Sequence, residues 1–304
     1  MAIDQWIGVT DGDLQTATNF KSGVALANGD ALLVPKTATQ AINASLDLSA
    51  VTLVGMETEK DSSVIIGTFT AAGLIVPAKF TMLHSAAYGN VTLAGSGEAA
   101  LYFANYGTIF VNEAPAASSV NYGLNLTGIM DGTGAGKIFI TAESGSVSLA
   151  ANSGEILEAE EINITNATVT IGSGVVDPDG STALPLLNVT GGTVINRAAV
   201  AVLNVDDSDF RHESGAVTTA TIKAGTMVVA GSMLLGTVYA RANTTLDMTG
   251  DLQAKTITDL YVGSGVTLDF RGGHVTITNA IHLQGCSVSD LTILLDPEQA
   301  ISFD

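Results

Sequence analysis

A short apolar triplet that recurs along the chain constrains its fold more than any other feature. Each copy has two apolar residues around a variable one, with Gly, Asn or Asp following within about three positions. The copies begin 14 to 25 residues apart, and they lie at residues 124–126, 138–140, 162–164, 187–189, 203–205, 220–222, 238–240, 260–262 and 281–283. A period near 20, built from short strands and small-residue turns, is the signature of a β-solenoid with one coil per repeat.

The rest of the chain also favours strands. Almost no window sustains apolar residues at helical spacing, whereas runs such as 266–270 and 275–278 alternate apolar and polar residues. We therefore expect an all-β chain, a right-handed, single-stranded parallel β-helix of about 20 residues per coil with capped ends. Residues 1–35 would form an N-terminal cap or attachment segment, 36–290 the β-helix, and 291–304 a C-terminal cap or tail.

Composition suits such coils and excludes several functions. Of 304 residues, 46% are hydrophobic, 13% are charged and 33 are glycine, which fits a large core with tight corners. The net charge of −19 excludes a basic nucleic-acid binder and disfavours anionic membrane surfaces. No apolar run approaches the ~18 residues of a membrane span, and we expect no secretory signal at the start. The single cysteine, Cys286, is expected to be a buried, inert thiol.

The opening segment carries a pattern that resembles a known family. It reads Trp6-x-Gly8, Asp11-Gly-Asp13, Thr18-Asn19-Phe20, Gly23 and Asn28-Gly29-Asp30 before an apolar strand. This pattern is similar to the opening of certain β-helix proteins of phage virions and bacterial surfaces, and residues 187–194 resemble their coil unit. The resemblance implies a structural role in a virion or on a cell surface, commonly as a homotrimer. It carries over no catalytic residue.

One polar cluster is dense enough to be considered as an active site. Asp206, Asp207, Asp209, Arg211 and His212 lie close together in the sequence, and β-helix polysaccharide hydrolases and lyases use carboxylates with Arg or His on one face. A glycosidase needs two carboxylates roughly 5–9.5 Å apart beside a substrate groove, and the polygalacturonase motifs Asn-Thr-Asp, Gly-His-Gly and Arg-Ile-Lys are absent. We expect a solvated turn here, and these five residues are the catalytic set only if the chain is an enzyme.

Other polar motifs are weaker. Residues 131–137 resemble a phosphate-binding loop, but Asp131 and Ile138 replace the Gly and the Ser or Thr that such a loop requires, so we expect a turn. The acidic stretches 155–161 and 177–180 match no calcium loop, and the histidines at 84, 212, 274 and 282 are too scattered for a zinc motif. The Thr-x-Thr runs at 168–170, 256–258 and 276–278 are explained by β propensity rather than by an ice-binding array. We expect no cofactor and no metal.

The middle residues of the triplets predict a column of outward side chains. If the flanking residues point inward, Tyr239, Tyr261 and His282 point outward in successive coils. The prediction adds Asn125, Asn163, Asn188 and Asn204 lower in the column, with Arg241, Asp247, Asp269 and Arg271 outside nearby. Such a stripe is a candidate protomer interface or glycan-contact strip, or else a set of ordinary surface aromatics. The residues named as a possible interface are Trp6, Phe20, Tyr239, Arg241, Tyr261, Arg271 and His282.

These features favour a non-enzymatic virion structural protein. We expect a phage capsid decoration (cement) protein or a fibre-like component that forms a homotrimer and binds capsid or other virion proteins. One alternative is a tailspike-like polysaccharide depolymerase or lyase, and another is a bacterial surface adhesin; a host glycan is a possible further partner. The expected location is the virion surface, or otherwise the extracellular space. Nucleic acid and membrane are not expected as partners.

Overall fold

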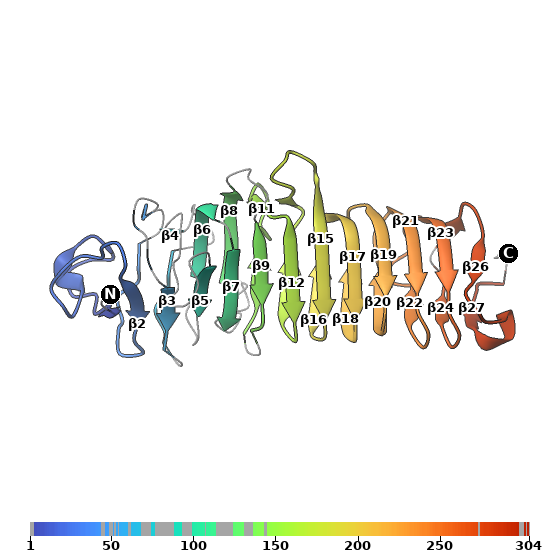
Figure 1. Ribbon diagram of the computed structural model, residues 1–304, viewed down its shortest axis with the longest axis horizontal. Helices are drawn as coiled ribbons and strands as arrows, with labels where there is room; N and C mark the ends of the chain where they lie inside the picture. Colours follow the sequence, from blue (N-terminus) through green and yellow to red (C-terminus); the bar gives the residue numbers. More distant parts are fainter. Residues whose placement is uncertain are drawn as a thin grey trace.

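The structure, a computed structural model, is an elongated stack of strands with the two chain ends at opposite ends of the stack (Figure 1). The described residues are 3–43, 46–48, 51, 53, 55–59, 62–67, 74–76, 88–92, 99–106, 108–113, 124–130, 136–142, 145–272, 274–297, 301 and 303. They form 27 strands and two 3-10 helices, η1 (Ala17–Asn19) and η2 (Val288–Asp290), and no longer helix. The chain is therefore all-β over these residues.

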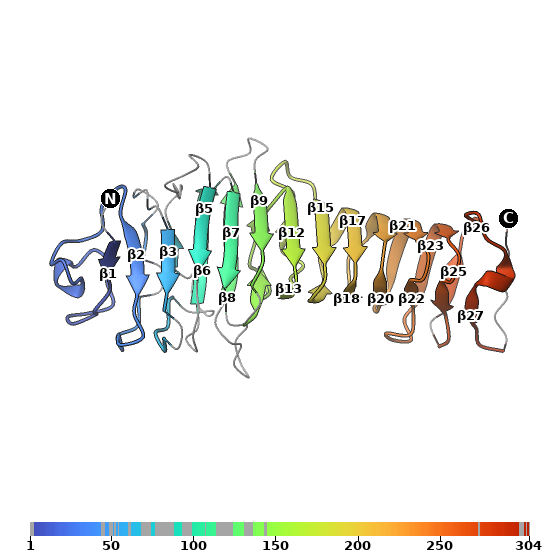
Figure 2. The same cartoon turned by 60° about the horizontal axis from the view of Figure 1, so that its bottom comes forward.

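Two large sheets contain all of these strands, which follow one another along the rod (Figure 2). The 14-stranded sheet contains β1 (Ile3–Gln5), β2 (Ala31–Val34), β3 (Gly55–Thr58), β5 (Tyr88–Thr92), β7 (Thr108–Glu113), β9 (Lys137–Ile140), β12 (Glu161–Thr165), β15 (Ala183–Thr190), β17 (Ala199–Asp206), β19 (Val217–Ile222), β21 (Met233–Ala240), β23 (Lys255–Val262), β25 (Val275–Ile277) and β26 (Ile281–Leu283). The 13-stranded sheet contains β4 (Leu74–Val76), β6 (Ala99–Tyr106), β8 (Leu124–Met130), β10 (Val147–Leu149), β11 (Leu157–Glu158), β13 (Thr168–Ile171), β14 (Val175–Val176), β16 (Thr193–Asn196), β18 (Ser208–His212), β20 (Gly225–Val229), β22 (Thr245–Asp247), β24 (Thr267–Asp269) and β27 (Thr292–Leu294).

Eight of the nine sequence triplets lie in register in the 14-stranded sheet. The strands pair in parallel, and the first residues of these triplets are direct neighbours in the order Ile138, Ile162, Leu187, Leu203, Ala220, Val238, Leu260 and Ile281. From Ile138 to Ile281 the flanking residues of these triplets are buried, and they form the core with inward residues of the other sheet. Large parallel sheets with this alternation are compatible with a β-solenoid.

The remaining triplet, 124–126, is the first in the sequence, and the prediction that its Asn125 belongs to the outward column is wrong. It lies on β8 in the other sheet, where Asn125 is beside Ser148 of β10. Asn125 is therefore not part of the outward column, and its side chain is buried, with Nδ2 donating to Oε1 of Glu155 at 2.8 Å. An apolar–x–apolar triplet marks a strand with an inward face, but it does not tell which sheet the strand joins.

The opening segment folds over one end of the stack. β1 pairs in parallel with β2, and Trp6 and Phe20 form an antiparallel bridge beyond it. The fully buried side chain of Asn19 accepts from the backbone N of Thr10 at 2.8 Å and donates to Oδ1 of Asp11 at 2.6 Å. At the other end, β27 pairs with β24, and Phe303 bridges to Ile281. At both ends of the stack, further residues thus pair with a strand near the end of a sheet.

Candidate functional site

The five residues of the cluster at 206–212 do not point to one place. Asp206 ends β17, and the exposed Asp207 forms the corner that leads to β18. On β18 the side chains alternate, so Asp209 and Arg211 face outward whereas His212 faces the interior and is 0% exposed. The cluster is divided between a corner, an outer face and the core, and it forms no shared carboxylate site.

Backbone geometry explains the residue type at Asp207. Its φ of 48° lies in the left-handed region, and so do the φ values of Asn166 (51°) and Gly191 (66°). Their backbone N–H groups donate to carbonyl oxygens of the next strand level: Asn166 to Thr190, Gly191 to Asp206, and Asp207 to Ala224. Asn, Asp and Gly are the residues that adopt this conformation most readily, so Asp207 serves a corner.

His212 is held by two hydrogen bonds inside the core. Its Nε2 donates to the carbonyl oxygen of Gly215 at 2.9 Å, so its Nδ1 accepts from Nδ2 of Asn196, also at 2.9 Å. Burial lowers the pKa of His212 to about 4, and it outweighs the hydrogen bond to Gly215, which acts in the opposite direction. A neutral imidazole enclosed in this way links two strand levels and does not face a substrate.

Arg211 is also engaged by a neighbour. Its Nε donates to Oε1 of Glu213 at 2.9 Å, and Nε of Arg197 donates to Oε2 of the same carboxylate at 2.8 Å. Burial alone would raise the pKa of Glu213, but the hydrogen bonds from the two guanidinium groups outweigh it and hold that pKa below its ordinary value. The three residues clamp adjacent turns of the stack.

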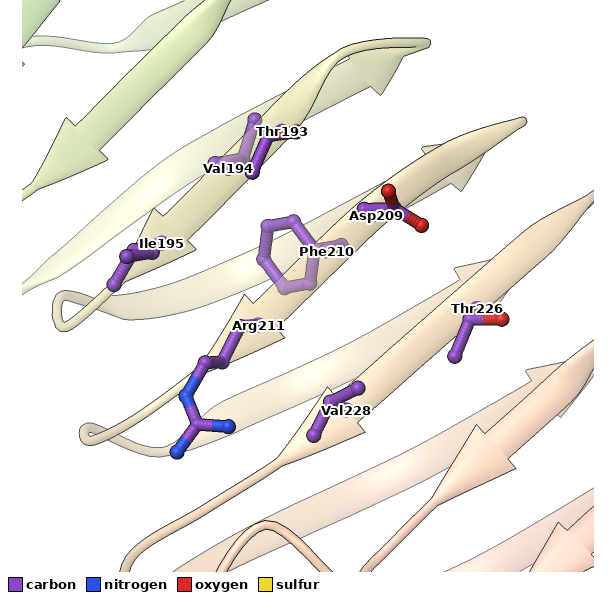
Figure 3. A pocket seen from close by; sticks show the side chains of 8 residues that line it. All are labelled: Thr193, Val194, Ile195, Asp209, Phe210, Arg211, Thr226 and Val228. Atoms are coloured by element: carbon purple, nitrogen blue, oxygen red, sulfur yellow. The ribbon is translucent and has the colours of Figure 1, made fainter.

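A shallow hollow of about 280 Å³ lies on the 13-stranded sheet beside two cluster residues (Figure 3). Its lining comes from β16, β18 and β20 and consists of Thr193, Val194, Ile195, Asp209, Phe210, Arg211, Thr226 and Val228. Asp209 supplies the only carboxylate in this lining, and Arg211 the only cation. The hollow can therefore accept a small group on an apolar floor, but the lining lacks the second carboxylate of a glycosidase pair.

The outward aromatic column is formed by three stacked rings. The centroids of Tyr239 and Tyr261 are 4.9 Å apart, and those of Tyr261 and His282 are 4.6 Å apart, with interplanar angles of 20° and 22°. The guanidinium carbon of Arg241 lies 5.4 Å from the centroid of the Tyr239 ring. Oδ1 of Asp259 lies 4.0 Å from Nε2 of His282. Because the rings cover one another's faces, the column presents mainly ring edges, whereas a sugar stacks on a free ring face.

An asparagine ladder continues the column below the aromatic rings. Nδ2 of Asn188 donates to Oδ1 of Asn163 at 2.9 Å, and Nδ2 of Asn204 donates to Oδ1 of Asn188 at 2.8 Å. Thr221 follows Asn204 in the register and precedes Tyr239. The strand alternation thus placed three of the four predicted asparagines correctly.

The charges expected beside the aromatic column lie elsewhere, apart from Arg241. Asp247 and Asp269 are register neighbours on β22 and β24 of the 13-stranded sheet. Nη2 of Arg271 donates to Oδ2 of Asp269 at 2.6 Å, and the hydrogen bonds from Arg271 lower the pKa of Asp269. Arg271 therefore lies in the turn after β24 of the 13-stranded sheet, whereas Tyr261 lies on β23 of the 14-stranded sheet. The prediction failed because alternation orders side chains along one strand but does not relate two strands.

The prediction that Trp6 and Phe20 are interface residues is wrong. They are 0% and 2% exposed, and their rings pack edge to face at a centroid distance of 5.6 Å. The indole Nε1 of Trp6 donates to the carbonyl oxygen of Gln40 at 3.1 Å. These two side chains are buried against each other within the opening segment, so neither is available to a partner. A sequence does not reveal whether an aromatic side chain packs on its own chain or on another.

The remaining sequence candidates have ordinary structural partners where the structure describes them. Lys137 pairs with Glu161, Glu155 accepts from Asn152 and Asn125, and Oδ1 of Asp177 accepts from the backbone N of Asp179 within its turn. Residues 131–135 and His84 lie outside the described residues. Within the described part of the chain, no group of three or more His, Cys, Asp or Glu side chains is placed to hold a metal ion. Cys286 is half-buried rather than buried, with Sγ 3.4 Å from the carbonyl oxygen of Val262.

Sequence reasoning missed Lys255, which is fully buried. Its Nζ donates to Oδ1 of Asp251 at 2.8 Å and to the carbonyl oxygens of Asp251 and Gln253, each at 3.0 Å. Three acceptors satisfy the three N–H groups of the ammonium, which is the condition for burying it. The only signal in the sequence is its place at an inward position of the alternating run Lys255-Thr256-Ile257 that begins β23.

No helix among the described residues is long and apolar enough to cross a membrane. Comparisons with protein-family models, curated proteins and solved structures found no match to the chain. Its function must therefore be inferred from its own residues.

Proposed function

We propose that the chain is a non-enzymatic structural rod of a phage particle, a capsid decoration protein or fibre-like component that forms a homotrimer. In this proposal the rod is a right-handed β-solenoid with about 20 residues per coil. The observation that carries it is the use of polar side chains, which do not converge on a shared site. His212 bonds to Asn196 and Glu213 bonds to Arg197 across neighbouring strand levels, and Lys255 bonds within its own turn.

The register of the 14-stranded sheet supports the coil length. From β9 to β26, register neighbours of the triplets are between 16 residues apart, as Leu187 and Leu203, and 25 residues apart, as Ile162 and Leu187. Nearer the N-terminal end the spacing reaches the 35 residues between Met56 and Val91. The buried Trp6–Phe20 pair and the Asn19 hydrogen bonds explain why the opening motif needs those residue types, since they hold a cap over the first strands. The sequence resemblance of this segment to virion β-helix proteins supports the location.

Sedimentation of phage particles from the strain that encodes the chain tests the location. We expect the chain to sediment with purified particles and to be detected there by antibody in many copies per particle. A chain found only in the supernatant of intact, washed particles would overturn the virion role. Cross-linking of the chain released from particles tests the trimer, and a monomer at all cross-linker concentrations would overturn it.

A polysaccharide depolymerase is the second candidate, and the hollow beside Asp209 is the observation that favours it. We expect no release of reducing sugar when the purified chain is incubated with capsule or lipopolysaccharide of the host. Release that is lost in Asp209→Ala but retained in Asp207→Ala, with both variants folded, would overturn the non-enzymatic proposal. Asp207 is the matched control because it is a neighbouring exposed aspartate outside the lining of the hollow.

A further inference from the structure

The long strands of the 14-stranded sheet bend, and the bend creates a second outer face. In β15, β17, β21 and β23 the alternation of buried and unburied residues is interrupted by two adjacent unburied residues, as at Pro185–Leu186 and Ala201–Val202. After this pair the alternation resumes with the opposite phase. The first half of each strand thus presents its outward residues on a different face from the Tyr239–Tyr261 column.

This second face is uncharged over four successive strand levels. We call it the neutral face and define it by the outward residues Ala183, Pro185, Leu186, Ala199, Ala201, Val202, Ala216, Thr218, Thr219, Leu234, Gly236 and Thr237. All twelve are half-buried or exposed, and Val202 and Leu234 are 40% and 51% exposed. A Cβ on Gly236 would collide with the carbonyl oxygen of Thr218, so the surface is flat at that level.

Acidic residues lie at both ends of the neutral face. Glu161 is the register neighbour of Leu186 on one side, and the backbone of Glu160 bonds to Leu186 at the same level. On the other side, Asp259 is the register neighbour of Thr237. In a chain with 30 acidic and 11 basic residues, twelve neighbouring outward positions without a carboxylate form a distinct surface.

From this surface we infer that the neutral face packs against a second copy of the chain; the inference rests on the proposed assembly of identical copies and assigns it a surface. Two copies that each carry −19 repel one another wherever carboxylates meet. The electrostatic cost of contact is lowest when the two copies meet through a face that carries no carboxylate. A basic partner would instead be drawn to the acidic surfaces, since the neutral face offers it no counter-charge.

The chemistry of the face also suits contact with itself. In a homotrimer whose copies all turn this face toward the common three-fold axis, residues of the face meet residues of the same face in the other copies, so they must pack against their own kind. Ala, Thr, Val and Leu meet this condition because their methyl groups pack together without leaving a buried charge unpaired. Val202 and Leu234 are the largest exposed apolar groups on the face, and they would contribute most of the contact energy.

An interface through the aromatic column would respond differently to salt concentration from an interface through the neutral face. An interface through Arg241 and carboxylates of the partner would weaken as salt screens the ion pairs. An interface through the neutral face would strengthen, because salt screens the repulsion between the two acidic copies and leaves the apolar contact intact. The response of the assembly to salt therefore distinguishes the two surfaces.

The experiment measures the mass of the full chain in solution by light scattering, at low and high sodium chloride and across about 1–100 μM. We expect a multiple of 30.9 kDa for the wild type, held or increased by salt. Leu234→Glu and Val202→Glu place a carboxylate on the face, and each should raise the dissociation constant at least about tenfold. Leu252→Glu is the matched control: Leu252 is 73% exposed in the turn before β23, off the face, and the constant should stay within about twofold.

Each outcome is decisive once circular dichroism shows that the variants are folded. A monomeric wild type, an assembly that salt dissociates, or an assembly that both face variants leave unchanged would overturn the inference. An assembly that dissociates in Leu234→Glu, formed by a chain absent from purified particles, would support the neutral face and overturn the virion role. If the chain is present on particles and its assembly is unaffected by the face variants, the virion role is supported and the neutral face is overturned as the interface.

Discussion

His212 and His282 both lie on strands of the stack, but His212 points into the interior and His282 points out from the surface. Comparing them shows which contacts a polar side chain needs in each place. His212 faces the core at 0% exposure, and both of its ring nitrogens have a hydrogen-bond partner. The side chain of His282 faces outward at 32% exposure and stacks on Tyr261. A polar residue inside must have its hydrogen bonds satisfied by the fold, because water cannot replace a missing partner there. Outside, ring stacking suffices.

Deletion of a large inward ring should have the largest effect. Phe210 precedes the core position of His212 by two residues, is 1% exposed and has Val194 and Met227 as register neighbours. Phe210→Ala should lower the free energy of unfolding by about 3–5 kcal/mol through lost burial and a residual cavity. Urea unfolding followed by circular dichroism measures this. A loss below about 1 kcal/mol would show that the interior is far less tightly packed than its burial indicates.

Acid should destabilise the fold through the inward histidine. The pKa of His212 is about 4 in the folded chain and 6.5 ordinarily, so as pH falls the unfolded chain binds a proton that the folded chain does not. His212 therefore lowers stability progressively between about pH 6.5 and 4, by about 3 kcal/mol in total, and has no such effect above this window.

The upper part of this window isolates His212 from the carboxylates. Asp11, Asp269 and Glu213 also have lowered pKa values and destabilise the fold in acid, but from ordinary values of only 3.8 to 4.5. We expect His212→Gln to flatten the dependence of unfolding free energy on pH between about 6.5 and 5. Asn188→Ala, which removes no ionisable group, is the control and should leave the slope unchanged; equal slopes in all three proteins would contradict the role given to burial.

Removal of the central outward ring should have a smaller effect. Tyr261 stacks on both Tyr239 and His282, so Tyr261→Ala should reduce the free energy of unfolding by about 1–2 kcal/mol. Tyr261→Phe keeps the ring and should differ from wild type by less than about 0.5 kcal/mol. Near-ultraviolet circular dichroism reports the loss of the stacked pair. A Tyr261→Ala loss as large as that of Phe210→Ala would erase the difference between the two sides.

The asparagine ladder should have the smallest effect. Asn188 is half-buried and bonds to Asn163 on one side and Asn204 on the other. Asn188→Ala removes both hydrogen bonds but lets water reach the partners, so we expect a loss of about 0.5–1 kcal/mol in urea unfolding. Asn196→Ala, at the buried partner of His212, is the matched inward control. It should cost about 1–3 kcal/mol, and equal losses at Asn188 and Asn196 would break the comparison.

Much of the fold was predictable, but the candidate site was predictable only in part. Alternation placed Tyr239, Tyr261 and His282 in one outward column, and the register confirms this order. The same reasoning misplaced Asn125, which lies on the other sheet. The cluster at 206–212 looked like a unit because its members are close in sequence. Strand alternation instead sends Arg211 and His212 to opposite sides.

The sequence by itself determined the local features of this protein. The period of two sets which residues of a strand face inward, and Asn, Asp and Gly mark the corners that need a left-handed backbone, as at Asp207. Only the tertiary structure decided which residues become neighbours across strands, because turn lengths vary and set the register. The Asn196–His212 pair, the Glu213 clamp and the bend that creates the neutral face all depend on that register.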